Sequence, residues 1–164
     1  MKLIYTLLLS ISLNSCGIYS FTGASIPVEA KTVSVNYFTT TATNSPSSLN
    51  QTITEGLKDL FLSQTSLDLT ELEGDLSFRG AITKYQVSPM AIQANETAGQ
   101  NRLTIAIKVK YNNSFDDKQN FESTFSRYRD FNSSENLADV EAVLIEEITK
   151  ELLEDVFNKA FVNW

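Results

Sequence analysis

Alternation of apolar and polar residues predicts three long strands in the second half of the chain. The strictest alternation runs over residues 102–111, where apolar side chains occupy every second position. Residues 75–87 follow the same period up to Pro89, which cannot donate a backbone hydrogen bond to a sheet. Residues 120–131 form a third such segment, with a bulge expected near Arg127. A period of two buries one side of a strand and leaves the other in solvent, so we expect a half-buried sheet.

Shorter strands and loops are expected in the first half. Residues 32–38 alternate with Val33, Val35 and Tyr37 on one side, and residues 17–21 and 67–69 are compatible with short strands. The polar stretches 39–48 and 90–100 read as loops, and Asn112-Asn113 favours a turn because asparagine tolerates positive φ.

Two helices are predicted from apolar residues that recur every three or four positions. The first starts near Ser47 or Ser48, whose hydroxyl can cap free backbone N–H groups, and it ends near Gln64. The second follows Asn132 and Glu135, which are spaced like a capping box, and continues to the last residues. Its expected buried stripe contains Leu137, Val140, Leu144, Ile148, Leu152, Val156 and Ala160.

The order β-β-α-(β)-β-β-β-α predicts an α+β fold. Its two helices are expected to pack against one mainly antiparallel or mixed sheet of about four to five strands. No internal repeat of 20 to 50 residues is visible, so a solenoid is not expected.

The amino terminus has the features of a bacterial export signal. Lys2 precedes an apolar stretch over residues 3–13, which is too short to cross a bilayer and typical of a secretory signal peptide. The sequence Leu13-Asn14-Ser15-Cys16-Gly17 resembles a lipobox, although Asn14 departs from the usual small or β-branched residue. We therefore expect a signal peptide over residues 1–15 and a single domain, 16–164, lipid-anchored at Cys16. An ordinary signal peptide followed by a structural cysteine is the alternative.

Composition excludes several classes of function. The chain has no histidine and one cysteine, which removes Ser-His and Cys-His nucleophile pairs and the usual zinc ligands. No phosphate-binding glycine loop or nucleophile elbow is present, and no acidic run has the spacing of a calcium loop. A net charge of −7 argues against a nucleic-acid partner. We expect a protein that is not an enzyme and holds no metal.

Positive charge is concentrated in the strand segment. Residues 75–131 contain 8 basic and 6 acidic residues, whereas the segments on either side are acidic. The basic residues that share faces of the predicted strands are Arg102, Lys108 and Lys110 on one strand and Arg127 and Arg129 on the next. They form either the solvent side of the sheet, paired in part with glutamates of the last helix, or a surface for an anionic amphiphile, whose phosphates guanidinium groups bind.

Several segments resemble the LptE family as it occurs in Bacteroidetes-type bacteria. The similar segments span the mature chain: residues 16–21, 80–85 before Pro89, 101–105, 125–128 and 156–164. The resemblance implies the family fold of two helices against a mainly four-stranded sheet. It also implies a lipopolysaccharide (LPS) assembly lipoprotein that plugs the LptD-type outer-membrane β-barrel, helps to assemble it and binds LPS, without a cofactor.

The expected location is the outer membrane, facing the periplasm. No aspartate follows Cys16, which in many Gram-negative bacteria would retain a lipoprotein in the inner membrane, and no acidic export run follows it. Three alternatives stay open: a structural or adaptor lipoprotein of another envelope complex, a surface polysaccharide-binding lipoprotein, and an enzyme. The five basic residues are candidates from charge pattern alone.

Overall fold

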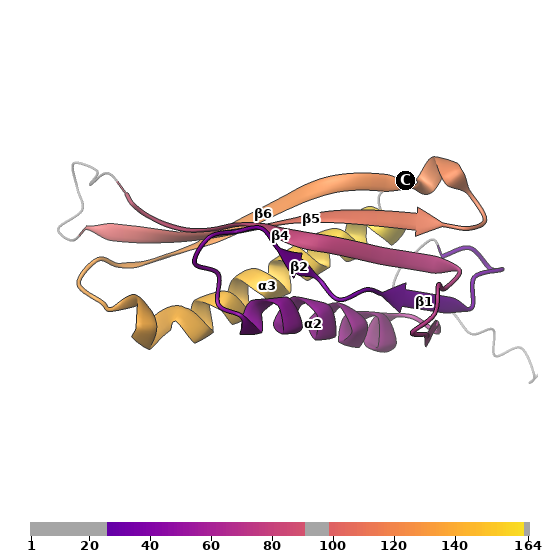
Figure 1. Ribbon diagram of the computed structural model, residues 1–164, viewed down its shortest axis with the longest axis horizontal. Coiled ribbons are helices and arrows are strands. Elements are labelled where there is room, and N and C mark those ends of the chain that lie inside the picture. Colours follow the sequence, from indigo (N-terminus) through magenta and orange to yellow (C-terminus); the bar gives the residue numbers. More distant parts are fainter. Residues whose placement is uncertain (1–25, 91–98, 163–164) are drawn as a thin grey trace, which may run out of the picture.

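The computed structural model describes residues 26–90 and 99–162 (Figure 1). The expected strand at 17–21, the lipidation site Cys16 and most of the expected loop 90–100 lie outside these ranges. The elements of the described residues are β1 (Thr32–Val35), β2 (Thr39–Thr40), α2 (Ser48–Gln64), β3 (Asp68–Leu69), β4 (Leu76–Pro89), β5 (Gln100–Asn113), the 3-10 turn η1 (Asp117–Gln119), β6 (Phe121–Asn132) and α3 (Leu137–Phe161).

The strands form one mixed sheet with the order β3-β1-β4-β5-β6, and β2 also pairs with β4. The long strands β4, β5 and β6 are antiparallel, whereas β1 and β2 run parallel to β4. Both helices lie on the same side of the sheet (Figure 1). The predicted α+β fold is confirmed, with six described strands rather than four or five. The two-residue strand β2 forms within the expected loop 39–48.

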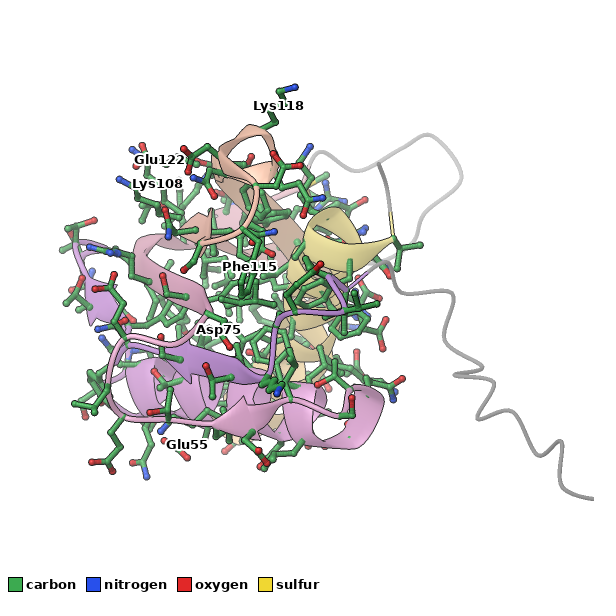
Figure 2. All side chains as sticks on the ribbon, turned by 90° about the vertical axis from the view of Figure 1, so that its right-hand side faces the viewer. Glu55, Asp75, Lys108, Phe115, Lys118 and Glu122 are labelled. Atoms are coloured by element: carbon green, nitrogen blue, oxygen red, sulfur yellow. The ribbon has the colours of Figure 1, made fainter. Side chains whose placement is uncertain are left out.

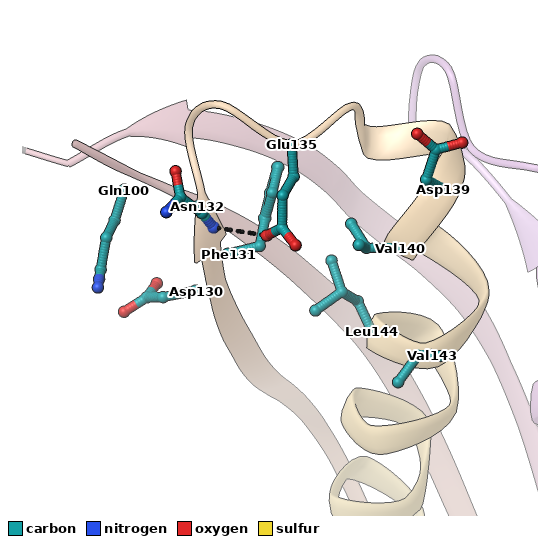
Figure 3. A pocket seen from close by; sticks show the side chains of 9 residues that line it. All are labelled: Gln100, Asp130, Phe131, Asn132, Glu135, Asp139, Val140, Val143 and Leu144. Atoms are coloured by element: carbon teal, nitrogen blue, oxygen red, sulfur yellow. Dashed lines mark hydrogen bonds between the residues drawn. The ribbon is translucent and has the colours of Figure 1, made fainter. Parts of the chain in front are cut away.

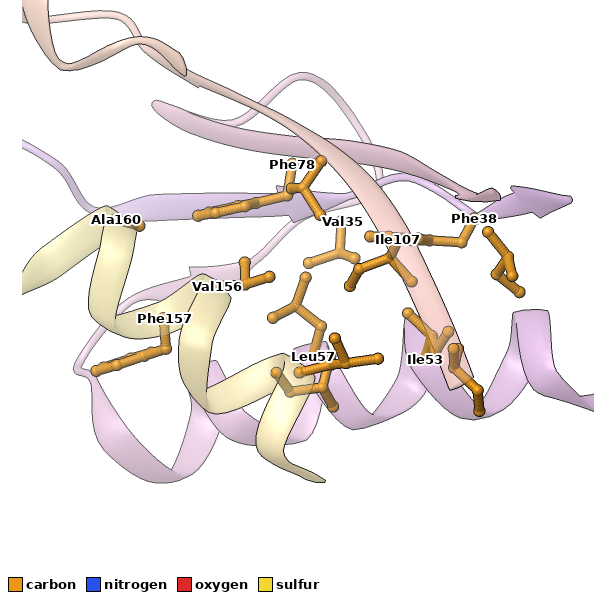
Figure 4. Packing of buried hydrophobic residues seen from close by; sticks show 14 of the residues in the cluster. Val35, Phe38, Ile53, Leu57, Phe78, Ile107, Val156, Phe157 and Ala160 are labelled. Atoms are coloured by element: carbon orange, nitrogen blue, oxygen red, sulfur yellow. The ribbon is translucent and has the colours of Figure 1, made fainter. Parts of the chain in front are cut away.

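The core lies between the sheet and the two helices. Ile53 and Leu57 of α2, Val156 of α3, and Phe78 and Ile107 of the sheet are buried in one apolar cluster (Figure 4). At one end the cluster is aromatic. The ring centroid of Phe78 lies 4.7 Å from that of Phe61 and 4.7 Å from that of Tyr111. Burial of one such side chain contributes about 1.5–3 kcal/mol, so this layer holds helices and sheet together.

The connection between β5 and β6 differs from the predicted turn. Asn112 and Asn113 remain in β5, and residues 114–120 make the turn. The buried Asn113 explains the difference, because its backbone N–H donates to Asn120 Oδ1 at 2.6 Å and its amide nitrogen donates to Gln119 Oε1 at 2.8 Å. Hydrogen bonds of the asparagine side chains thus close a longer loop, where the sequence predicted a tight turn.

The register also differs from the prediction at one point. The pairing of β5 with β6 is regular from Gln100↔Asn132 to Tyr111↔Phe121, so there is no bulge near Arg127. The irregularity lies instead in β4, between Ile82 and Lys84. Such an extra residue reverses the side of the sheet to which every later residue of the strand projects.

The helix caps differ in detail from those expected. Ser47 precedes α2 without a side-chain capping bond. Helix α3 begins only at Leu137, and the side chain of Asn136 caps it by accepting from the Ala138 N–H. Glu135 still accepts from the Asn132 backbone N–H at 3.0 Å, as in a capping box, but this bond closes the loop before the helix.

Tyr37 does not share the buried face of Val33 and Val35 as predicted. Strand β1 ends at Val35, and the Tyr37 side chain is 60% exposed. Phe38 is the buried aromatic residue here, and it lies against Gly80 of β4. A Cβ atom at Gly80 would meet the Phe38 ring and would lie 2.7 Å from the Lys108 carbonyl oxygen. Gly80 is therefore needed for the close approach of the Phe38 ring to β4 and β5.

Gly80→Ala is expected to lower the free energy of unfolding by about 1–3 kcal/mol, because the added methyl group forces a buried ring and a strand backbone apart. Urea unfolding monitored by circular dichroism measures this loss. Gly99→Ala is the control, since its Cβ would meet chiefly the Ser133 side chain, and its effect should stay within about 0.5 kcal/mol. Equal effects of the two substitutions would contradict the steric role of Gly80.

Ion pairs connect β6 to α3 on the helix side of the sheet. Arg127 binds both carboxylate oxygens of Asp155 at 2.6 Å. Arg129 donates to Glu147 Oε2 at 2.7 Å and to Glu151 Oε1 at 2.5 Å. The bond from Arg129 holds the pKa of Glu151 below its ordinary value. This network confirms the interpretation that some of the strand cations pair with acids of the last helix.

Arg129→Gln is expected to destabilise the protein most at neutral pH. A carboxylate with a lowered native pKa binds fewer protons in the native than in the unfolded state, so its contribution is present above pH 4.5 and is lost as the pH falls through the native pKa. The stabilities of wild type and variant should therefore differ at pH 7 and converge at pH 3. Urea unfolding midpoints at the two pH values measure this. Arg79→Gln is the control, because Arg79 lies 3.8 Å from its only ion-pair partner in the described chain, Glu73. Parallel pH profiles for wild type and Arg129→Gln would contradict the network's role.

Candidate functional site

The face of the sheet opposite the helices carries a group of basic side chains. Strand register places five basic residues on this side of β4 and β5: Arg79, Lys84, Arg102, Lys108 and Lys110. We call them the basic face. Among the described residues no helix covers it, and Figure 2 shows Lys108 on the far side of the molecule from Glu55 of α2. Positive charge is therefore displayed on one side of an acidic protein.

The sheet divides the five residues that the sequence suggested. Arg102, Lys108 and Lys110 share the basic face, as predicted for one side of that strand. Arg127 and Arg129 pair in register with the buried residues Ile105 and Leu103, so they lie on the helix side and bind the acids of α3. Ligand binding by these two arginines stays a prediction, and the structure does not bring them together with the other three.

Two members of the basic face were missed in the sequence. Arg79 pairs with Lys110 and alternates with the core residue Phe78, so the period of the strand was a sufficient signal for it. Lys84 carried no such signal, since a regular strand would place it on the core side with Ile82. The register shift between these two residues turns Lys84 outward.

The cations of the basic face are not equally available. Arg102 is held by Asp130 through bonds of 2.7 and 2.8 Å, and its guanidinium carbon lies 3.6 Å from the centroid of the Tyr128 ring. Lys108 forms an ion pair with Glu122, whereas Lys110 has no ion-pair partner among the described residues. Arg102 is thus an internal partner of β6, whereas Lys84, Lys108 and Lys110 are exposed, and the last two lie on the same strand.

A depression of about 350 Å³ lies at Lys108 and Lys110. Tyr37, Thr39, Arg79, Gly80, Ala81, Lys108, Lys110 and Glu122 line it. We call it the cationic hollow. The ion pair with Lys108 holds the pKa of Glu122 below its ordinary value, so Glu122 is ionised at neutral pH and three cations face one carboxylate. Figure 2 shows Lys108 and Glu122 side by side. Ammonium and guanidinium groups in this arrangement can bind a phosphate or carboxylate group.

A different hollow opens on the helix side, between the end of β6 and the first turns of α3 (Figure 3). Its volume is about 440 Å³, and Phe131, Val140, Val143 and Leu144 give it an apolar lining. Asp130, Glu135 and Asp139 also line it, and none of its lining residues is basic. The hollow is therefore unsuited to an anion, and the cationic hollow is the candidate site for one.

Two further features bear on function. No helix in the described part of the chain is both long enough and apolar enough to span a membrane. Within residues 26–90 and 99–162, no group of three or more His, Cys, Asp or Glu side chains is placed to hold a metal ion.

Solved structures share this fold at low sequence identity. A hypothetical protein, CT253 from Chlamydia trachomatis, superposes with a TM-score of 0.54 at 8% identity, covering 82% of this chain and 99% of that one. The protein XCC0632 from Xanthomonas campestris gives 0.52 at 9% identity, covering 82% and 87%. Uncharacterized lipoprotein B from Nitrosomonas europaea gives 0.50 at 11% identity, covering 84% of each chain. These likenesses establish a shared fold.

No curated protein sequence matches the chain. A family model does match it, over residues 30–160, and this range includes nearly every described strand and helix. The model is described as LptE, lipopolysaccharide-assembly. With most of its length matched, the chain belongs to the LptE family of lipopolysaccharide-assembly lipoproteins.

Proposed function

We propose that this protein is an outer-membrane lipoprotein that acts as plug and assembly partner of an LptD-type β-barrel and binds LPS during its insertion into the outer leaflet. The family match over residues 30–160 supports a role in LPS assembly. The observation that carries ligand binding is the basic face, which is open to solvent although the chain as a whole has a net charge of −7.

The position of the charges suits an anionic glycolipid. Lipid A carries phosphate groups, and Lys108, Lys110 and Arg79 line one hollow in which phosphate oxygens can accept from all three. The acids of α3 lie on the helix side, where Arg127 and Arg129 already neutralise several of them. Lipid phosphates are therefore attracted to one side of the domain only.

Membrane attachment completes the proposal. A signal peptide over residues 1–15 and a lipidated Cys16 would tether the domain 16–164 to the membrane through acyl chains. A domain that binds and positions a glycolipid by surface charge needs neither a cofactor nor a catalytic group. The protein is accordingly proposed to make no covalent change in LPS.

The double substitution Lys108→Glu and Lys110→Glu is expected to weaken LPS binding about tenfold or more, because it converts attraction for lipid A phosphates into repulsion. Pull-down of the purified protein on immobilised LPS at low ionic strength measures the loss, and the circular dichroism spectrum should not change. The matched control is Lys58→Glu with Lys150→Glu on the helix layer, which alters the net charge equally. Equal binding by wild type and the Lys108/Lys110 variant would reject the basic face as the LPS site.

Affinity purification of the lipidated protein from detergent-solubilised membranes tests the proposed partner. Mass spectrometry is expected to find a large outer-membrane barrel protein in constant ratio to the bait, because a plug is held inside its barrel. A Cys16→Ala variant should lose its acyl chains and leave the membrane fraction. Recovery of a different envelope complex without a barrel would favour the adaptor lipoprotein instead.

A further inference from the structure

The outermost strand of the sheet, β6, has a free backbone edge. It ends the strand order β3-β1-β4-β5-β6, and among the described residues no strand lies beyond it (Figure 1). Ser133, which follows β6, donates its N–H to the Gly99 carbonyl at 3.0 Å. Because backbone groups alternate in direction along an antiparallel strand, the odd-numbered residues of β6 bond to β5 and the even-numbered ones point away from it. The outward residues before Asn132 are Glu122, Thr124, Ser126, Tyr128 and Asp130.

Two hydrogen bonds at this edge agree with the assigned direction. The N–H of Asn132 donates to Glu135, and the carbonyl of Tyr128 accepts from the guanidinium group of Arg129 at 2.9 Å. Both backbone groups thus find partners away from β5. The outward N–H groups of Thr124 and Ser126 meet no acceptor in the part of the chain that the structure describes.

Strand β6 lacks the features that usually protect an edge strand from pairing. It is 12 residues long, contains no proline and pairs with β5 in regular register, whereas protected edges are short, bulged, interrupted by proline or lined by free charges. Every charged side chain of β6 is already in an ion pair within the domain: Glu122 with Lys108, Arg127 with Asp155, Arg129 with Glu147 and Glu151, and Asp130 with Arg102. The edge is therefore open to an additional strand.

A row of side chains on α3 runs beside β6 on the helix side. Residues four apart lie on one face of a helix, and this row is Asp139, Val143, Glu147, Glu151 and Asp155. We call it the acidic row. In the described chain its only ion-pair partners are Arg127 and Arg129, so negative charge is in excess. A strand added to β6 would project every second side chain towards this row, where basic residues are attracted and acidic ones repelled.

The hollow between the end of β6 and α3 adds an apolar contact (Figure 3). Phe131, Val140, Val143 and Leu144 give it an apolar lining, and we call it the apolar hollow. Val143 also belongs to the acidic row, and its side chain is 58% exposed. The volume of about 440 Å³ is ample for one large apolar side chain. Since Asp130 of the free edge also lines the hollow, a strand paired with β6 would reach it.

We propose that β6 accepts an extended segment of a partner protein as an additional strand of the sheet. The segment carries lysine or arginine at alternate positions, which face the acidic row, and a large apolar residue that enters the apolar hollow. Uncharged residues lie between them, because the outward acids Glu122 and Asp130 are already paired. This inference goes beyond the proposed LPS site and does not depend on it, since β6 and α3 carry it.

A second copy of this chain is a less favourable occupant of the edge. Two β6 strands paired edge to edge would bring the acidic rows of two α3 helices to one interface. Juxtaposed like charges oppose such an association, whereas alternating lysines neutralise the row. Charge complementarity therefore selects a basic partner segment over self-association.

The test is an NMR titration of the purified mature protein in mild detergent with a synthetic peptide. The peptide Leu-Thr-Lys-Thr-Lys-Thr-Lys-Thr-Leu, blocked at both ends, presents leucine to the apolar hollow in either strand direction. A peptide of the same composition with its three lysines adjacent is the control for charge alone. The alternating peptide is expected to bind about tenfold more tightly and to slow hydrogen exchange at the amides of Thr124 and Ser126.

Two substitutions test the edge and the apolar hollow separately. Ser126→Pro removes an outward N–H and is expected to weaken binding about tenfold or more, while the circular dichroism spectrum is retained because no bond to β5 is lost. Val143→Lys places a positive charge in the hollow and should weaken binding about three- to tenfold without altering the backbone. Leu62→Lys is the matched control, with an effect within twofold: Leu62 is 56% exposed on α2, which packs near β1 and β3.

Equal affinities for the two peptides, or binding without protection of the Thr124 and Ser126 amides, would overturn strand addition at β6. Unchanged binding by both Ser126→Pro and Val143→Lys would overturn it as well. A dimer seen by analytical ultracentrifugation and abolished by Ser126→Pro would assign the edge to a second copy and reject the basic partner. LPS binding by Val143→Lys is expected to match wild type, so failure of strand addition leaves the proposed function standing.

Discussion

Burial of only one face of the sheet is the constraint on which the rest of the structure depends. Helices α2 and α3 cover a single side, and the apolar residues of β4 and β5 must all project towards them to reach the aromatic core around Phe78 and Tyr111. Because strand side chains alternate, the other half of each strand is then presented outward. The basic face is a direct consequence of this geometry, and it requires no additional element to hold it in place.

The same geometry separates the charges of the protein into two layers. On the helix side, Arg127 and Arg129 form ion pairs with Asp155, Glu147 and Glu151. These ion pairs connect the edge strand β6 to α3. On the open side, Asp130 binds Arg102 and Glu122 binds Lys108, and these are the acids that register places opposite β5 cations. The outward cations exceed the outward acids, so the domain presents a positive side to a ligand although its net charge is negative.

Periodicity predicted the long strands, both helices and most of the core, because one-sided burial imposes a period that the sequence displays directly. It placed Lys108 and Lys110 on a common face for the same reason. The outward position of Lys84 was not predicted, because one extra residue in β4 reverses the alternation of its side chains. No local sequence pattern reveals such an extra residue. Arg127 and Arg129 looked equivalent to Arg102, since a strand pattern alone does not relate the faces of two neighbouring strands.

The alternation within β4 also determines how the site is held. Leu76 and Phe78 are fully buried in the core, while Arg79, the next residue along the strand, lines the cationic hollow on the opposite side. The residues proposed to bind the ligand therefore share a backbone with the residues that anchor the sheet, and Gly80 follows at the point where Phe38 packs against it. A site whose backbone belongs to paired strands needs little backbone ordering on binding. Recognition by such a face depends on the spacing of charges along paired strands, which the hydrogen-bond register fixes.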